Sequence, residues 1–105
     1  MITSGEGKYK VFLNRISLEN DLIYILGGGE KPHIGSVVIC EPGKKTNVIK
    51  FNNHYDQVVL QPIAEAACRK YHTKVIAIGG VHVDNASKEE IEILVNNCKE
   101  LIKCI

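Results

Sequence analysis

Two nearly continuous apolar runs, each ending in or interrupted by consecutive glycines, constrain the fold of this chain most strongly. The first is "DLIYILGG" at residues 21–28, and the second is "KVIAIGGVHV" at residues 74–83. Short apolar runs bounded by turn-forming residues are typical of strands that are buried in a sheet. We therefore expect both segments to be buried strands, with 74–83 near the centre of the sheet.

Three further segments predict strands. Residues 8–17 alternate loosely between apolar and polar, residues 33–42 stop at a Pro-Gly pair, and residues 47–51 alternate again. Alternation is the pattern of a strand with one buried face. The sequence thus predicts five strands, of which 47–51 is the shortest.

Helical spacing appears in two segments. Between residues 56 and 71 apolar residues recur on one helix face, although Pro62 is tolerated only near a helix start and favours a beginning near residue 60. In 86–105, Ser87 and Glu90 have the spacing of a capping box. The apolar stripe expected to be buried in this second helix consists of Ile91, Leu94, Val95, Cys98, Leu101 and Ile102.

The predicted order is therefore β-β-β-β-α-β-α. Four strands joined as a meander and followed by a β-α-β crossover give a mixed sheet with two helices packed on one face, an α/β (α+β sandwich) fold. A length of 105 residues suits a single domain spanning 1–105. Two helices on one face leave the other face of the sheet uncovered, so we expect a homodimer.

Composition excludes several classes of protein. With 13 basic and 12 acidic residues the net charge is +1, which offers no basic surface for nucleic acid. The chain shows no apolar run long enough to span a membrane and no signal peptide at its start, which favours a cytoplasmic protein. The four cysteines lack zinc-site spacing and are expected to be reduced and structural.

The predicted topology brings three histidines to one edge of the sheet. His33 opens the third strand, His54 follows the fourth, and His82 closes the fifth, with Asp84 just beyond it. Both helices also begin at this edge, so the positive ends of their dipoles point towards it. This arrangement suits an anion such as a phosphate or a carboxylate.

Other interpretations of the same residues remain open. The glycines could serve only as sharp turns, and neither loop matches a phosphate-binding fingerprint. The spacing of the histidines neither supports nor forbids a metal site. Ser36 is the one hydroxyl group near them, and it makes a weak case for a nucleophile.

Three short motifs resemble those of a known family. "GGEKPHIG" (28–35), "FNNH" (51–54) and "GVHVD" (80–84) are similar, in order and spacing, to motifs of the small D subunit of gallate decarboxylase, the LpdD-like prenylated flavin chaperone family. The resemblance covers nearly the whole chain. Carried over residue by residue, it marks as cofactor-binding positions Gly28, Gly29, Pro32, His33, Gly35, His54, Gly80, His82 and Asp84.

The resemblance implies an accessory protein rather than an enzyme. Its partner would be a UbiD-type decarboxylase of aromatic acids or the flavin prenyltransferase, and its cofactor would be prenylated FMN, bound transiently. It also implies an α/β sandwich like that of proteasome assembly chaperones, which dimerises. Two alternatives stay open: a small enzyme with a histidine as general base, with or without a metal, and a general assembly chaperone without a small ligand.

Overall fold

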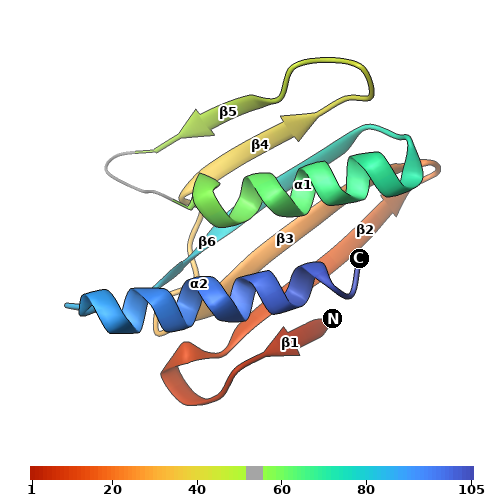
Figure 1. Cartoon of the computed structure of the whole chain (residues 1–105). Coiled ribbons are helices and arrows are strands. Elements are labelled where there is room, and N and C mark those ends of the chain that lie inside the picture. Colours follow the sequence, from red (N-terminus) through yellow and green to blue (C-terminus); the bar gives the residue numbers. More distant parts are fainter. Residues whose placement is uncertain (52–55) are drawn as a thin grey trace.

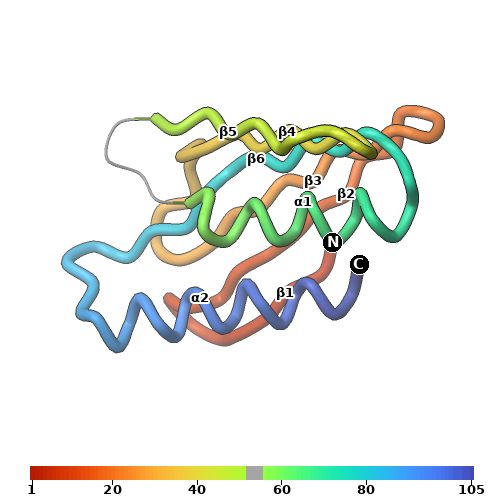
Figure 2. The backbone as a smooth tube through the Cα atoms, turned by 45° about the horizontal axis from the view of Figure 1, so that its top comes forward, coloured from red at the N-terminus to blue at the C-terminus, as the bar shows by residue number. Residues whose placement is uncertain are grey.

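The computed structural model describes residues 1–51 and 56–105. They form a six-stranded mixed sheet with two α-helices packed on one face, which confirms the expected fold class (Figure 1). Figure 2 shows the sheet and the helices as two layers. In chain order the elements are β1 (Ile2–Ser4), the 3₁₀ helix η1 (Gly7–Tyr9), β2 (Val11–Leu18), β3 (Asp21–Gly29), β4 (Ser36–Cys40), β5 (Asn47–Lys50), α1 (Gln57–Tyr71), β6 (Val75–His82) and α2 (Lys88–Ile102).

The strand order β1-β2-β3-β6-β4-β5 corrects the predicted meander. β6 lies between β3 and β4, parallel to β3 and antiparallel to β4, so β3 and β4 do not pair. β5 and β6 run in the same direction, as expected, but β4 separates them. The short edge strand β1 had no clear pattern in the sequence.

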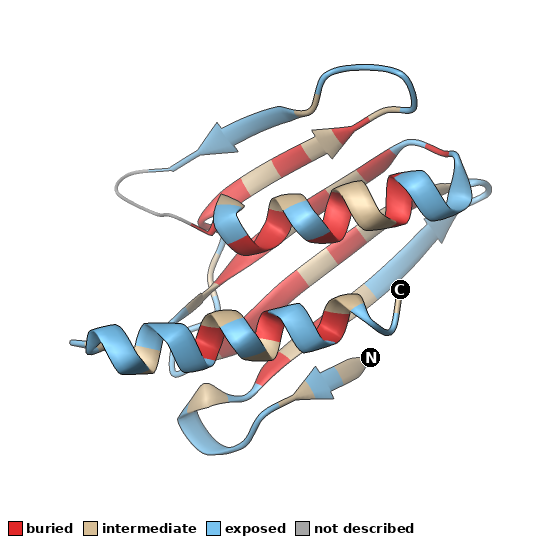
Figure 3. Ribbon diagram, in the orientation of Figure 1, coloured by how far each residue is buried: buried red, intermediate tan, exposed pale blue. Residues whose placement is uncertain are grey.

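Burial explains why β3 and β6 take central positions. Residues of both strands that face the helices, such as Leu26 and Val75, are fully or almost fully buried. Their other faces also carry isoleucines, so a central position removes more apolar surface from water than an edge position would. The edge strand β5, by contrast, is exposed along its whole length (Figure 3).

Helix α1 begins at Gln57, so the expectation of a start near residue 60 is wrong. Pro62 lies inside the helix, on its exposed side. A proline there removes one backbone hydrogen bond, which would otherwise reach the carbonyl of Val58, also an exposed residue. The apolar residues Leu60, Ile63 and Ala67 are completely buried against the sheet, and their packing outweighs this loss.

Helix α2 has the predicted capping box. The Glu90 backbone N–H donates to Ser87 Oγ, and the Ser87 N–H donates to the Glu90 side chain. Leu94, Cys98 and Leu101 of the expected stripe are buried. Ile91 is an exception, since it is 51% exposed.

Among the described residues, the sheet face opposite the helices is mostly apolar and carries no helix; we call it the open face. Its side chains alternate with those buried under α1 and α2, and the strand register aligns them in rows. Ile16 and Ile49, near its two sides, are 45% and 49% exposed. The aliphatic side chains of the open face are Ile16, Ile23, Ile25, Val37, Ile39, Ile49, Ile76 and Ile78.

All four cysteines are free, and Cys40, Cys68 and Cys98 are buried. Burial raises the pKa of the Cys68 thiol to about 11 and that of Cys98 to about 12. Both side chains therefore stay protonated near neutral pH and pack as small apolar groups. Within the described part of the chain, no helix is long and apolar enough to cross a membrane.

Candidate functional site

The ends of three strands meet at one end of the sheet. Gly29 at the end of β3 pairs with His82 at the end of β6, and Ser36 at the start of β4 pairs with Gly79. The segment 30–35 passes the end of β6, where the backbone N–H groups of residues 30 and 31 donate to the His82 carbonyl at 2.7 and 3.2 Å. This connection lets β3 and β4 lie on either side of β6.

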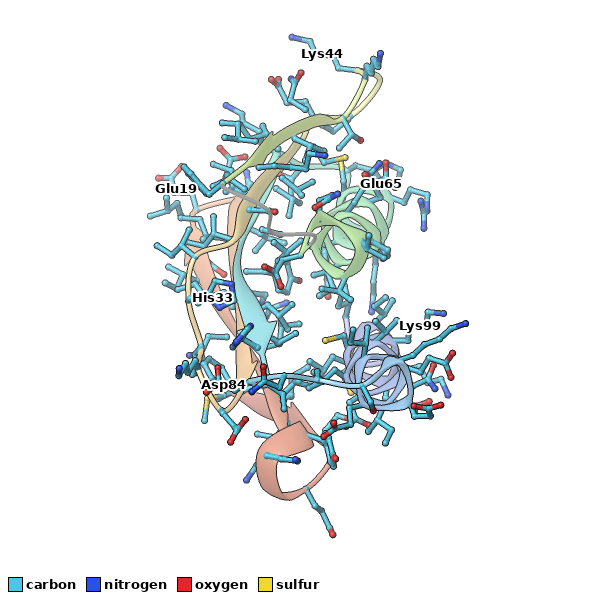
Figure 4. The ribbon with its side chains drawn as sticks, turned by 90° about the vertical axis from the view of Figure 1, so that its left-hand side faces the viewer. Glu19, His33, Lys44, Glu65, Asp84 and Lys99 are labelled. Atoms are coloured by element: carbon cyan, nitrogen blue, oxygen red, sulfur yellow. The ribbon has the colours of Figure 1, made fainter. Side chains whose placement is uncertain are left out.

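His33 lies in this segment rather than in a strand, because β4 begins only at Ser36. Its ring centroid is 6.0 Å from that of His82, with the two planes at 86°. Figure 4 looks at this end of the molecule and shows His33 beside β6, on the side away from the helices. The structure therefore brings two of the three expected histidines together, while His54 falls outside the described residues.

Both nitrogens of the His33 ring face acceptors. Nδ1 lies 3.0 Å from the backbone oxygen of Lys31, and Nε2 lies 3.2 Å from Oδ2 of Asp56. A neutral imidazole has one N–H and can donate to only one of these partners. Both contacts are hydrogen bonds only when the ring carries a proton on each nitrogen and hence a positive charge.

Asp56, which the sequence analysis did not single out, connects this histidine to the sheet. Its side chain is only 9% exposed, and its Oδ1 accepts a hydrogen bond of 3.1 Å from the Val81 backbone N–H. This residue immediately precedes α1, where an aspartate is expected to cap the helix, but its side chain makes no capping bond. Asp56 lies two residues after His54 of the "FNNH" motif. An acidic residue so close to a motif histidine could have marked Asp56 as a site residue from the sequence.

The Asp56–His33 pair explains two of the marked glycines. A Cβ atom at Gly35 would collide with Oδ2 of Asp56. A Cβ at Gly80 would lie 2.7 Å from the same oxygen and 3.0 Å from Nε2 of His33. These glycines therefore make room for the contact between Asp56 and His33.

The other marked glycines allow close packing of the backbone. A Cβ at Gly28 would lie 2.5 Å from the Lys10 carbonyl oxygen, and one at Gly29 would collide with the His82 carbonyl. Both glycines also have positive φ angles, of 143° and 73°. Their first role is structural. Pro32 is exposed and precedes His33 in the loop.

His82, Asp84 and Lys31 form an exposed network next to His33. The Asp84 carboxylate lies 3.0 Å from Nε2 of His82 and 3.0 Å from Nζ of Lys31. Hydrogen bonds from Lys31 first, and from His82 second, hold the pKa of the Asp84 carboxyl below its ordinary value. We call the residues Lys31, His33, Asp56, His82 and Asp84 the strand-end cluster.

The two helix N-termini differ in what they offer an anion. Glu89 and Glu90 occupy the first turn of α2, so its positive end is already matched by its own carboxylates. The first turn of α1 has no acidic residue, but Asp56 directly precedes it. The expectation that both N-termini serve an incoming anion is therefore weakened for α2.

The described residues give little support to a metal site or to Ser36 as a nucleophile. In 1–51 and 56–105, no group of three or more His, Cys, Asp or Glu side chains has an arrangement that could hold a metal ion. Ser36 is completely buried, and its Oγ makes no hydrogen bond within the described chain. A nucleophilic serine requires a base as its partner.

One comparison with known proteins agrees with the sequence motifs. No curated protein matches this chain. One family model does match, over residues 5–105, and its description is a prenylated flavin chaperone LpdD-like domain. A chaperone family fits the expected non-catalytic role. From the three motifs and this match over nearly its whole length, the chain belongs to the LpdD-like family of prenylated flavin chaperones.

Proposed function

We propose that this protein is an accessory chaperone for a UbiD-type decarboxylase of aromatic acids, and that its strand-end cluster binds the phosphate of prenylated FMN. The partner is the decarboxylase or the flavin prenyltransferase that modifies the flavin. The family membership supports the general role. The phosphate site is supported by the geometry of the cluster.

One observation carries the phosphate site. The Asp84 carboxylate, which is half exposed, already sits between the Lys31 ammonium and the His82 ring at 3.0 Å from each. It thus fills the position of an anion held by two basic groups, next to the ring of His33. A phosphate that displaces Asp84 would gain the same charge-assisted hydrogen bonds. The residues present therefore fit an anionic group.

The test measures binding of prenylated FMN by calorimetry under anaerobic conditions. Replacing His82 by Ala removes one charge-assisted hydrogen bond to the phosphate and should weaken binding by about 1–3 kcal/mol. His33→Ala should also weaken binding, because it removes the ring that packs against His82. Asp84→Asn removes the competing charge and should tighten binding. His72→Asn, at the far end of α1, is the control and should change nothing.

The affinity should fall in the histidine variants and rise in Asp84→Asn, and this difference separates a phosphate site from a structural cluster. A merely structural cluster would lose affinity in Asp84→Asn as well as in His82→Ala. Unchanged binding in a double His33→Ala/His82→Ala variant would refute the phosphate site. Co-purification of the protein with its decarboxylase, with and without the flavin, tests the accessory role separately.

We also propose that the protein works as a homodimer joined through the open face. This face has exposed isoleucines, such as Ile16 and Ile49, and neither helix covers it. A two-fold pairing of such faces buries apolar surface on both copies at once. A general assembly chaperone would instead use this face for other proteins, and the oligomeric state decides between the two.

A further inference from the structure

A cleft of about 430 Å³ lies on the helix side of the molecule, next to the strand-end cluster. It is formed by the first turn of α1, the end of β6 and the N-terminal half of α2. Its size falls in the range of small-molecule sites, roughly 300–1,000 Å³. The lining residues are Asp56, Val58, Val59, Val81, His82, Val83, Asn85, Ala86, Ile91, Leu94 and Val95.

The lining is mostly aliphatic, and two of its side chains are left unusually exposed. Val58 on α1 is 60% exposed and Ile91 on α2 is 51% exposed. Ile91 belongs by its spacing to the buried stripe of α2, yet no residue of the described chain covers it. An apolar group in the cleft would cover both side chains and remove their surface from water.

The charges around the cleft determine which part of a ligand it can hold. Asp56 is a buried carboxylate in the lining, so an anionic group is disfavoured inside the cleft. On the other side of the same carboxylate, His33 and its neighbours offer basic groups. Asp56 and His82 belong both to the cleft and to the strand-end cluster, so the two sites adjoin.

We infer that the cleft holds the apolar edge of the prenylated flavin, its dimethylbenzene ring and the added prenyl-derived ring, with the phosphate outside it at the strand-end cluster. The inference rests on the proposed function and adds the orientation of the ligand. A ring system with an apolar edge, joined through a side chain to an anionic phosphate, matches an apolar cleft that adjoins basic groups. The buried carboxylate of Asp56 prevents the reverse orientation.

The experiment uses prenylated FMN and its dephosphorylated form as probes, with binding to the full chain measured by calorimetry. The double variant Val58→Gln/Ile91→Gln keeps helix-forming residues but removes the apolar rim. It should weaken binding of both probes by at least about tenfold. The matched control is Ile93→Gln, an exposed isoleucine of α2 outside the cleft, which should bind both probes as the unchanged protein does.

The cluster variant Lys31→Ala separates the two parts of the site, because it should weaken binding only of the phosphorylated probe. If the double cleft variant binds both probes normally while Lys31→Ala loses the phosphorylated one, the ring does not lie in the cleft and the phosphate site stands. If the unchanged protein binds neither probe, the proposed function fails together with this inference. Loss of decarboxylase co-purification alone in the cleft variant would also overturn the inference, because the cleft would then receive a protein side chain.

Discussion

At the scale of residues, the central feature is the side chain of Asp56. It connects the start of α1 to the backbone N–H of Val81 in β6 and to the ring of His33 in the loop 30–35. Because the carboxylate is buried, loss of one of these contacts costs more than loss of an exposed ion pair. Asp56 therefore fixes how the loop 30–35 sits against the sheet.

The first prediction concerns Gly35, whose missing side chain leaves space for Asp56. Gly35→Ala should destabilise the protein by about 1–3 kcal/mol, because the new methyl group overlaps Oδ2 of the carboxylate. Asp56→Ala should be destabilising by itself, since Val81 loses its acceptor. Combined, the two changes should cost clearly less than their sum, as measured by urea denaturation.

The double-mutant cycle of Gly35→Ala and Asp56→Ala can also contradict this prediction. Strictly additive free energies would mean that the added methyl group at Gly35 does not act through Asp56. The glycine would then have to be explained by its backbone pairing with Gly79.

At the scale of elements, the N-terminus of α2 holds an unusually stabilised carboxylate. Glu90 accepts a hydrogen bond from the Ser87 N–H and from the Tyr9 hydroxyl at 2.8 Å, and pairs with Lys8 at 2.9 Å. These partners, with the Ser87 bond as the largest cause, lower the pKa of Glu90 to about 2. The same contacts attach η1 to α2.

The second prediction follows from this pKa by linkage. A carboxyl group with a pKa lower in the folded than in the unfolded chain stabilises the fold above its unfolded pKa, near 4.5, and loses this effect as the pH falls towards 2. Glu90→Gln should therefore reduce the fall in unfolding free energy between pH about 6 and about 3. Glu92→Gln on the same helix is the control. Equal pH dependence in both variants would show that Glu90 is not specially stabilised.

At the scale of the whole molecule, the two faces of the sheet differ. The helices bury one face, where Val11, Leu26 and Val38 are almost completely enclosed. The open face keeps a row of isoleucines without a helix above it. Large apolar patches of this kind mark sites of association in soluble proteins.

The third prediction is that light scattering returns about twice the chain mass of 11.6 kDa. Ile16→Glu combined with Ile49→Glu should give monomers, because a dimer would then bury charges without partners. Ile93→Glu, at a similarly exposed position on α2, should remain dimeric. A mass near 11.6 kDa for the unchanged protein would rule out the dimer, and the open face would then be available to another protein.

The sequence by itself determined the local elements. The apolar runs at 21–28 and 74–83, the helical spacing of 86–105 and the capping box at Ser87 all depend on residues close together in the chain. Such patterns are visible without knowledge of the partners. The same holds for the three family motifs, and hence for membership of the family.

Only the tertiary structure decided the strand order and the connections of the site. β6 lies between β3 and β4 because the segment 30–35 is long enough to pass its end. A central position also removes more of the apolar surface of β6 from water than an edge position would. The pairing of His33 with Asp56, and the cleft between α1 and α2, join segments that are distant in sequence. No local period encodes such contacts, since they arise from the packing of the helices and strands against one another.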